Sequence, residues 1–169
     1  MGHSKDWCSM MERVQENWIE EKGKPMGGGY IPWGTFLEKG IEYFDVDLKQ
    51  SKELRGLFDC KYKECFANAQ MIAINESYPD LMYCEGFGCN IVPAHHAWLL
   101  DIQTAKVVDP TWVLEKSDDA DYFGFPIPDE FLWLKLRDWS RYEADPTFFW
   151  DYIEKIKEEE TKTNVKRNN

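Results

Sequence analysis

The sequence predicts an α+β domain in which a helix that carries Cys65 packs on an antiparallel sheet. Two observations lead to this fold class. Apolar residues recur at three- and four-residue spacing in several stretches, which is typical of amphipathic helices. Between residues 81 and 112, short segments rich in aromatic and β-branched residues alternate with polar or proline-containing breaks, which is typical of strands.

The 169 residues are expected to form a single domain. With 43% hydrophobic and 15% aromatic residues, the chain can build one substantial core but hardly two. We therefore assign one domain to residues 1–160. Between 161 and 169, Val165 is the only apolar residue, so this tail is expected to be mobile.

Before residue 60, apolar spacing predicts three helical stretches. Residues 5–21 form the clearest pattern, and shorter amphipathic segments are expected around 36–44 and 48–58. The stretch 23–34 contains three consecutive glycines and two prolines and therefore predicts a loop.

A further helix, predicted within 61–77, carries Cys65 on its apolar face and points it toward the body of the domain. The start of this helix stays open. If it begins near Glu64, free N–H groups favour a thiolate at Cys65 and one of them can bind an oxyanion, whereas a start at Asp59 loses most of that benefit. A helix start together with an imidazolium can lower a cysteine pKa from about 8.5 to roughly 3.5–7.5.

The second half of the chain is expected to hold the sheet and two more helices. The predicted strands are 81–88, 95–101 and 106–112. Residues 122–128 contain two prolines, so we expect them to form a surface excursion rather than a central strand. Apolar faces then predict helices over 131–142 and 146–160.

Charge and composition exclude several classes of partner. The formal net charge is −11, so the long-range field repels phosphate backbones and nucleic acid is not an expected partner. An acidic protein that imitates nucleic acid to occupy a DNA-binding protein is an alternative. Because there is no membrane-length apolar stretch or secretory signal, we expect a cytoplasmic protein without a membrane partner. The five cysteines are expected to be reduced.

A hairpin between the second and third predicted strands would bring His96 and Asp109 together. If the chain turns back about a point between Ile102 and Gln103, His96 and Asp109 become directly opposite residues on one face. Cross-strand Cβ atoms lie about 4.5–5.5 Å apart, which suits a carboxylate bonded to an imidazole N–H. Because the turn lacks glycine, we expect a four-residue loop in this register. His95 would point to the opposite face.

Cysteine, histidine and aspartate are together the residue types of a nucleophilic triad. Cys65 would attack a carbonyl carbon, His96 would take the thiol proton and later protonate the leaving group, and Asp109 would fix the imidazole tautomer. The resulting thioester would pass its acyl group to water or to an amine. This chemistry needs no cofactor.

The same residues also have structural interpretations. A cysteine on an apolar helix face is usually a small core residue, and Asp109 before Pro110 can open a turn. Zinc is a further alternative, although Cys-x4-Cys followed by adjacent histidines matches no standard ligand spacing. Its ligands would be Cys84, Cys89, His95 and His96.

The order of three motifs resembles the catalytic core of the transglutaminase-like superfamily within the papain-like cysteine proteins. The motifs are ECFANA with Cys65, HAW with His96 and VVDPTW with Asp109. The resemblance implies a papain/transglutaminase-like fold, in which the cysteine opens a helix packed on an antiparallel sheet, here with additional N- and C-terminal helices. From about residue 60 to 128, the chain also resembles small single-domain proteins of uncharacterised activity from bacteriophages and bacteria.

The resemblance implies a cysteine-dependent hydrolase or acyltransferase that acts on an amide, such as a protease, an amidase or a transglutaminase-like enzyme. Its substrate would be a protein, a peptide or a small amide, and a host protein is a candidate target in a phage setting. The family often completes its oxyanion hole with a glutamine or an aromatic side chain. The upstream candidates are Gln50, Trp33 and Tyr30.

Two other functions stay open. A non-catalytic acidic binding or inhibitor protein could retain the same fold and triad. An arylamine N-acetyltransferase would use a similar triad with acyl-coenzyme A, but the arginine–diglycine sequence that precedes the cysteine in those enzymes is absent here.

Overall fold

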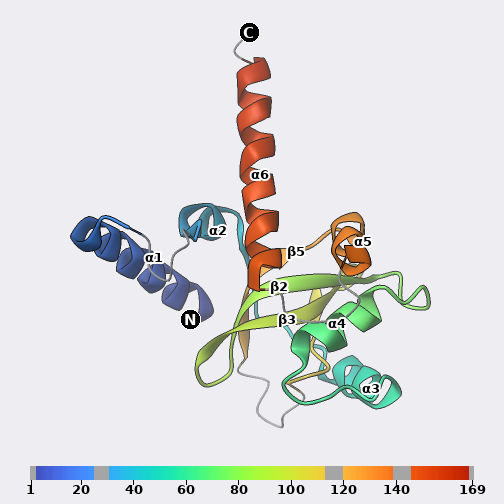
Figure 1. Cartoon of the computed structure of the whole chain (residues 1–169). Helices are drawn as coiled ribbons and strands as arrows, with labels where there is room; N and C mark the ends of the chain where they lie inside the picture. The colour runs from blue at the N-terminus through green and yellow to red at the C-terminus, as the bar shows by residue number, and fades with distance from the viewer. Residues whose placement is uncertain (1–2, 25–30, 113–119, 139–145, 168–169) are drawn as a thin grey trace.

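The computed structural model describes residues 3–24, 31–112, 120–138 and 146–167, which form six helices and five strands (Figure 1). The helices are α1 (His3–Lys22), α2 (Trp33–Lys39), α3 (Leu48–Leu57), α4 (Cys65–Ala73), α5 (Asp129–Asp138) and α6 (Pro146–Arg167). The strands are β1 (Ile41–Tyr43), β2 (Leu81–Cys89), β3 (Pro93–Asp101), β4 (Lys106–Val108) and β5 (Asp121–Pro126). The α+β fold class is confirmed.

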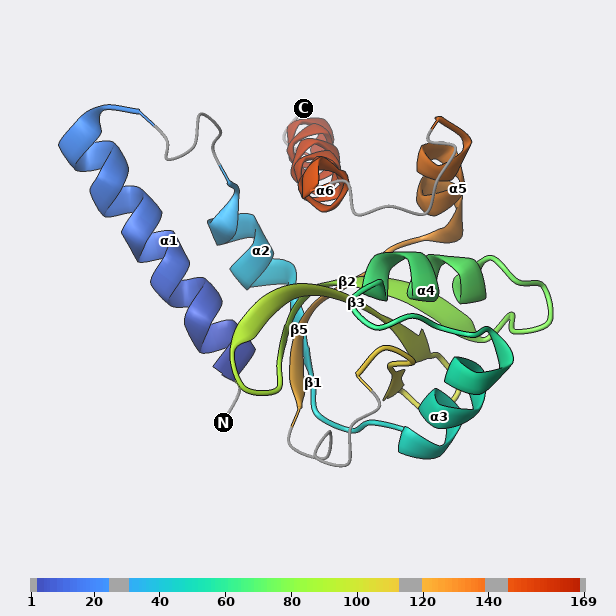
Figure 2. The ribbon, with the colours of Figure 1, turned by 60° about the horizontal axis from the view of Figure 1, so that its bottom comes forward.

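A curved antiparallel sheet, in the order β1-β5-β2-β3-β4, lies at the centre of the molecule (Figure 2). β2 and β3 pair from Leu81↔Asp101 to Cys89↔Pro93, so they form its longest ladder. Side chains alternate between the two faces of a strand. Neighbouring residues of β3 therefore pack into different hydrophobic clusters, one on each face of the sheet.

Three buried clusters hold the layers together. Under α4, Ala69 and Ile72 of the helix pack with Tyr83 of β2 and Leu99 of β3. The opposite face buries a second set, namely Tyr43, Cys84, Trp98, Val107, Ala120 and Tyr122. An aromatic cluster joins α1, α2 and α6 to the sheet through Cys8, Trp33, Phe36, Phe87, Phe123, Phe125 and Ile153.

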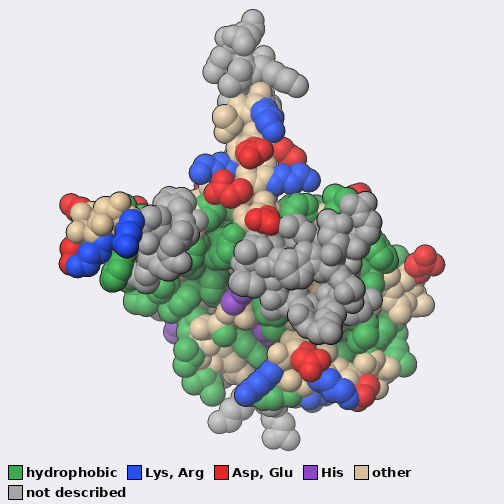
Figure 3. All heavy atoms as spheres, viewed as in Figure 1, with side chains coloured by type: hydrophobic (Ala, Val, Ile, Leu, Met, Phe, Trp, Pro, Cys, Tyr) green, Lys and Arg blue, Asp and Glu red, His purple; other side chains and the backbone are tan. Residues whose placement is uncertain are grey.

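α6 rises from the sheet (Figure 1), and acidic and basic side chains are mixed along its length (Figure 3). Ion pairs one turn apart, such as Lys162 with Glu158 at 3.4 Å, support this exposed helix. The tail predicted for 161–169 is helical as far as Arg167, and its mobility stays a prediction. Among the described helices, none combines the length and the apolar character that a membrane crossing requires.

The prediction that residues 122–128 form a surface excursion is wrong. Asp121–Pro126 is β5, which pairs with β1 on one side and with β2 on the other. The prolines do not prevent this, because Pro126 is the last residue of the strand and Pro128 lies beyond it. Inside the strand, Gly124 lies opposite Gly86, where a Cβ atom on either residue would collide with the neighbouring backbone.

Other boundaries shift by smaller amounts. The segment predicted as helical around 36–44 divides into the end of α2 and the three-residue strand β1. The helix predicted within 61–77 is confirmed but spans Cys65–Ala73, and Tyr62, which precedes it, is exposed. The third predicted strand, 106–112, ends at Val108.

The start of α1 is anchored by a residue that lies far away in the sequence. Asp121 of β5 accepts hydrogen bonds from the backbone N–H groups of Ser4 (2.8 Å) and His3 (3.1 Å). The first N–H groups of a helix have no partner within the helix, so Asp121 acts as their cap.

We expect Asp121→Ala to lower the free energy of unfolding by about 0.5–2 kcal/mol, the usual range for the loss of a helix cap. Urea denaturation followed by circular dichroism measures the change. Asp45→Ala is the matched control, because Asp45 is exposed and only its ion pair with Lys106 at 3.6 Å is lost. Equal effects of the two substitutions would contradict the capping role.

Candidate active site

Cys65 is the first residue of α4, and Glu64 is the N-cap. The sequence allowed this helix to begin either at Asp59 or near Glu64, and the structure shows the start near Glu64. The start of a helix presents free N–H groups and a partial positive charge, and both favour negative charge on a side chain there. Cys65 is 7% exposed, so the residue is largely buried.

The chain that leads into Cys65 is held in a fixed conformation. Asn68, in the first turn of α4, accepts a hydrogen bond from the N–H of Lys61 (3.1 Å) and donates one to its carbonyl (2.7 Å). Lys63 has a φ of 67°, which L-residues rarely adopt. Together these features turn the chain sharply so that the helix begins at Cys65.

His96 of β3 and Asp109, just after β4, form a buried pair. His96 Nε2 lies 2.7 Å from Asp109 Oδ2, and each residue is only 2% exposed. The sequence predicted this contact, but the register that produces it differs. β4 pairs Val108 with Leu99, so His96 lies two residues from the position directly opposite Asp109.

The register differs because of the turn between β3 and β4. Asp101 Oδ1 accepts hydrogen bonds from the N–H groups of Gln103 (2.8 Å) and Thr104 (3.2 Å), and Ala105 takes a positive φ of 57°. These interactions set a four-residue loop over 102–105, one residue later than predicted. A shift of two in register keeps the face of every side chain. His96 and Asp109 therefore meet diagonally.

The Asp109 carboxylate accepts four hydrogen bonds. Oδ1 accepts from the backbone N–H groups of Thr111 (2.9 Å) and Trp112 (3.1 Å), and Oδ2 accepts from His96 and from the Tyr122 hydroxyl (3.0 Å). Burial by itself would raise the pKa of Asp109, but the charge and hydrogen bond of His96, with the two amides, lower it below its ordinary value. Asp109 is thus an anion in the folded protein.

Cys65 and Asp109 act on the same imidazole. Burial alone would lower the pKa of His96, but Asp109, and after it the hydrogen bond and charge of Cys65, raise that pKa to about 9. With Nε2 bonded to Asp109, Nδ1 is the nitrogen left for the sulfur. Cys65 therefore lies near the imidazole that Asp109 holds, so the structure places the three residues in one site.

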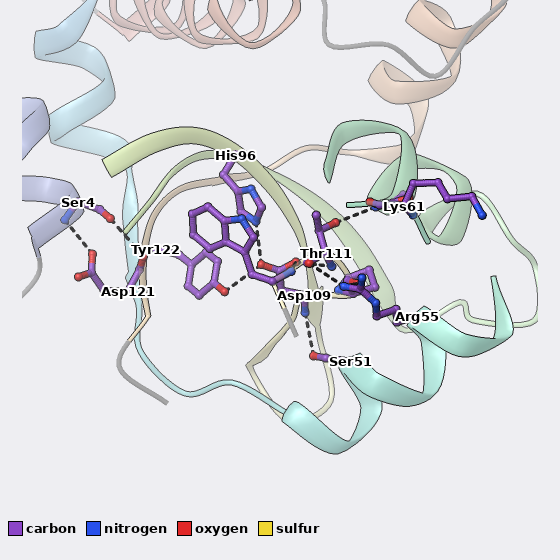
Figure 4. A network of polar contacts seen from close by, with 12 residues as sticks. Ser4, Ser51, Arg55, Lys61, His96, Asp109, Thr111, Asp121 and Tyr122 are labelled. Carbon is purple, nitrogen blue, oxygen red and sulfur yellow. Dashed lines mark hydrogen bonds and ion pairs between the residues drawn. The ribbon is translucent and has the colours of Figure 1, made fainter. Parts of the chain in front are cut away.

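Two residues from α3 and one from α4 hold the loop that carries Asp109 (Figure 4). Ser51 Oγ accepts from the N–H of Asp109 (2.9 Å), and Arg55 donates to the carbonyl of Thr111 (2.9 Å). Asn68 donates to Thr111 Oγ1 (2.9 Å). Because Asn68 also fixes the chain before Cys65, one side chain links the segment that leads into Cys65 to the loop that carries Asp109.

Trp112 covers the imidazole of His96. The two rings are stacked, with centroids 3.8 Å apart and an angle of 15° between their planes. Gly88 of β2 makes room for this stack, because a Cβ there would lie 2.8 Å from Trp112 Cζ3 and 3.3 Å from His96 Cδ2. The covering ring keeps water away from the His96–Asp109 hydrogen bond.

The candidates for the oxyanion hole lie elsewhere or outside the described residues. Trp33 is buried in the aromatic cluster, 5.3 Å from Trp150 and 5.6 Å from Phe87 between ring centroids. Gln50 lies in the first turn of α3, where its N–H donates to Asp47. Neither takes part in the described contacts of the three site residues. Tyr30 belongs to the residues that the structure does not describe.

The ligands of the zinc alternative do not converge. β3 directs His95 and His96 to opposite faces, and His95 Nε2 lies 2.9 Å from Glu85 Oε1. All five cysteines are free thiols. In the part of the chain that the structure describes, no group of three or more His, Cys, Asp or Glu side chains is arranged to hold a metal ion.

Sequence analysis missed Tyr122 and Trp112 as parts of the site. Tyr122 fell in the segment that was not assigned to the sheet, so nothing connected it with Asp109. Trp112 stands three residues after Asp109, within the motif VVDPTW, and that proximity was the available signal.

Comparison of the chain with protein-family models, with curated proteins and with solved structures finds no match.

The raised pKa of His96 predicts a pH-dependent stability. A group whose pKa rises on folding stabilises the protein fully below its unfolded pKa, here 6.5, and loses that contribution as the pH rises through about 9. We expect the free energy of unfolding to fall across this window by up to about 3 kcal/mol. Urea unfolding at a series of pH values measures the fall. A His96→Gln variant with an equally steep profile would assign the fall to other groups.

Gly88→Ala should separate Trp112 from His96, because the new methyl group takes the space of the indole. Overpacking of this kind costs about 1–3 kcal/mol of folding free energy. Gly56→Ala is the control, since nothing lies within 4 Å of its added Cβ in α3, and it should stabilise by up to about 1 kcal/mol. Thermal unfolding of both variants provides the comparison, and a neutral Gly88→Ala would mean that the stack is loosely packed.

Proposed function

We propose that this protein is a cysteine-dependent hydrolase or acyltransferase that acts on an amide. Cys65 is the proposed nucleophile, His96 the general base and acid, and Asp109 the residue that orients the imidazole. The observation that carries the proposal is the buried bond between His96 Nε2 and Asp109 Oδ2 at 2.7 Å, with Cys65 at the start of α4 near enough to the same ring to raise its pKa.

In the proposed reaction, the proton of Cys65 resides on His96, and the thiolate Sγ attacks the carbonyl carbon of the substrate. The tetrahedral intermediate then expels the amine, which takes the proton from His96, and an acyl thioester remains on Cys65. Attack by water or by a second amine, with His96 as the base, releases the acyl group and restores the thiol. In the first half of the reaction the leaving amine takes the proton shared by Cys65 and His96, and in the second half the attacking water or amine supplies the proton that restores the pair.

The electrostatics of the site fit these roles. With a pKa of about 9, His96 is protonated at neutral pH, which is the form that stabilises a neighbouring thiolate and that protonates a leaving amine. Asp109 Oδ2 favours the tautomer with hydrogen on Nε2 whenever the ring is neutral. The backbone N–H groups at the start of α4 are the donors available to a developing oxyanion.

The resemblance of the three motifs to the transglutaminase-like superfamily belongs to this proposal, as do a cytoplasmic location and a protein, peptide or small-amide substrate. A host protein stays a candidate target. Because His96 and Asp109 are almost completely buried, a substrate has to approach from the side of Cys65. That restricted approach also suits the rival function, a binding protein that keeps the triad without turnover.

Labelling with iodoacetamide near neutral pH tests the proposal. Burial raises the pKa of the other four thiols, that of Cys60 to about 11, so they should react slowly. We expect Cys65 to react at least about tenfold faster than each of them. Peptide mass spectrometry reads the modification at each cysteine.

His96→Gln should remove the preference for Cys65, whereas His95→Gln should retain it, because His95 lies on the other face of β3. If Cys65 labels no faster than the buried thiols, the proposed chemistry fails. An acyl adduct on Cys65 after incubation with lysate would favour turnover. A biological effect that survives Cys65→Ala would instead favour binding.

A further inference from the structure

Tyr122 of β5 reaches the candidate site from a strand that the catalytic proposal does not use. We propose that Tyr122 is a positioning residue of this site, whose hydroxyl holds Asp109 Oδ2 in the direction of His96. The inference rests on the proposed function for its catalytic meaning. The arrangement itself is a property of the fold.

The geometry singles out one oxygen atom. Asp109 Oδ2 accepts from His96 Nε2 at 2.7 Å and from the Tyr122 hydroxyl at 3.0 Å, while two backbone amides occupy Oδ1. If His96 were the only donor to Oδ2, the carboxylate could swing away during any step in which the imidazole moves. With the tyrosine in place, both oxygens stay held when that hydrogen bond is broken.

Tyr122 is well suited to a fixed role. It is 1% exposed, its ring lies 5.1 Å from that of Trp98, and its backbone lies between Gly88 of β2 and Tyr43 of β1. Burial, with the nearby charge of Asp109, raises its pKa well above the ordinary value, so the hydroxyl keeps its proton at neutral pH and acts as a donor. Asp121, next to it, is held by the start of α1.

A donor on Oδ2 also affects the proton affinity of His96. The hydroxyl draws negative charge from the oxygen that stabilises the imidazolium, so its removal should make His96 hold its proton more tightly. Among the residues that the structure describes, the titratable groups that face His96 are Cys65 from α4, Asp109 after β4 and Tyr122 from β5. Glu85 and His95 lie on the opposite face of the sheet.

The test is the titration of His96, followed by NMR in protein with 13C-labelled histidine rings. Tyr122→Phe should raise the midpoint of His96 by about half to one pH unit. Tyr83→Phe is the matched control, since it removes another buried hydroxyl, 2.7 Å from the Glu85 carboxylate on the α4 side of the sheet, and should leave the midpoint unchanged. No shift in Tyr122→Phe, or equal shifts in both variants, overturns the inference.

Wild-type protein provides a second measurement that does not depend on the stability of Tyr122→Phe. The buried hydroxyl proton of Tyr122 should change its chemical shift with the same midpoint as the His96 ring, because both groups donate to one oxygen. If the chemical shift of the Tyr122 hydroxyl proton does not change as His96 titrates, the inference is overturned.

These measurements separate the inference from the proposed function. If the His96 midpoint moves in Tyr122→Phe but Cys65 shows no selective labelling, the positioning contact stands and the catalytic proposal fails. If Cys65 labels selectively but the midpoint stays unchanged, the inference alone fails.

Discussion

The burial of the Asp109 carboxylate is the constraint on which the rest of the site depends. A carboxylate that is only 2% exposed stays ionised only if protein donors replace its water. Those donors come from β3, from β5 and from the backbone of the following loop, and α3 holds the same loop through Ser51. One buried negative charge therefore ties together segments that lie far apart in the sequence, and it gives them a single relative arrangement.

The sheet supports this arrangement by separating two similar groups. On one face, His96 meets Asp109 with a tyrosine hydroxyl on the carboxylate, and on the other face His95 lies by Glu85, which also accepts from a tyrosine. The two groups differ in their access to solvent, because the side chain of His95 is 27% exposed and that of His96 is 2% exposed. What distinguishes His96 is the influence of Cys65, at the start of α4, on the charge of its ring, not the type of its carboxylate partner.

Much of this could be predicted from local patterns. The helix with Cys65 follows from apolar spacing, and the contact between His96 and Asp109 follows from strand alternation, which survives a register shift of two. The register itself depends on Asp101, whose side chain sets the turn through bonds that periodicity does not reveal. β1 is only three residues long, too short for a period-two pattern to show, and it pairs with β5 from the other half of the chain. The segment of β5 was not assigned to the sheet because Pro126 and Pro128 argued against a central strand. Tyr122 was missed for the same reason.

Adjacent histidines on opposite faces of β3 also restrict how this chain can evolve. The segment from Leu99 to Asp101 is fixed by its ladder with β4. A single-residue insertion or deletion between His96 and Leu99 would turn the wrong imidazole toward Asp109, whereas a change of two residues would preserve the correct one. An odd change in length in this short stretch would thus place His96 on the wrong face of the sheet. Homologues that keep the site should therefore differ there by an even number of residues or not at all.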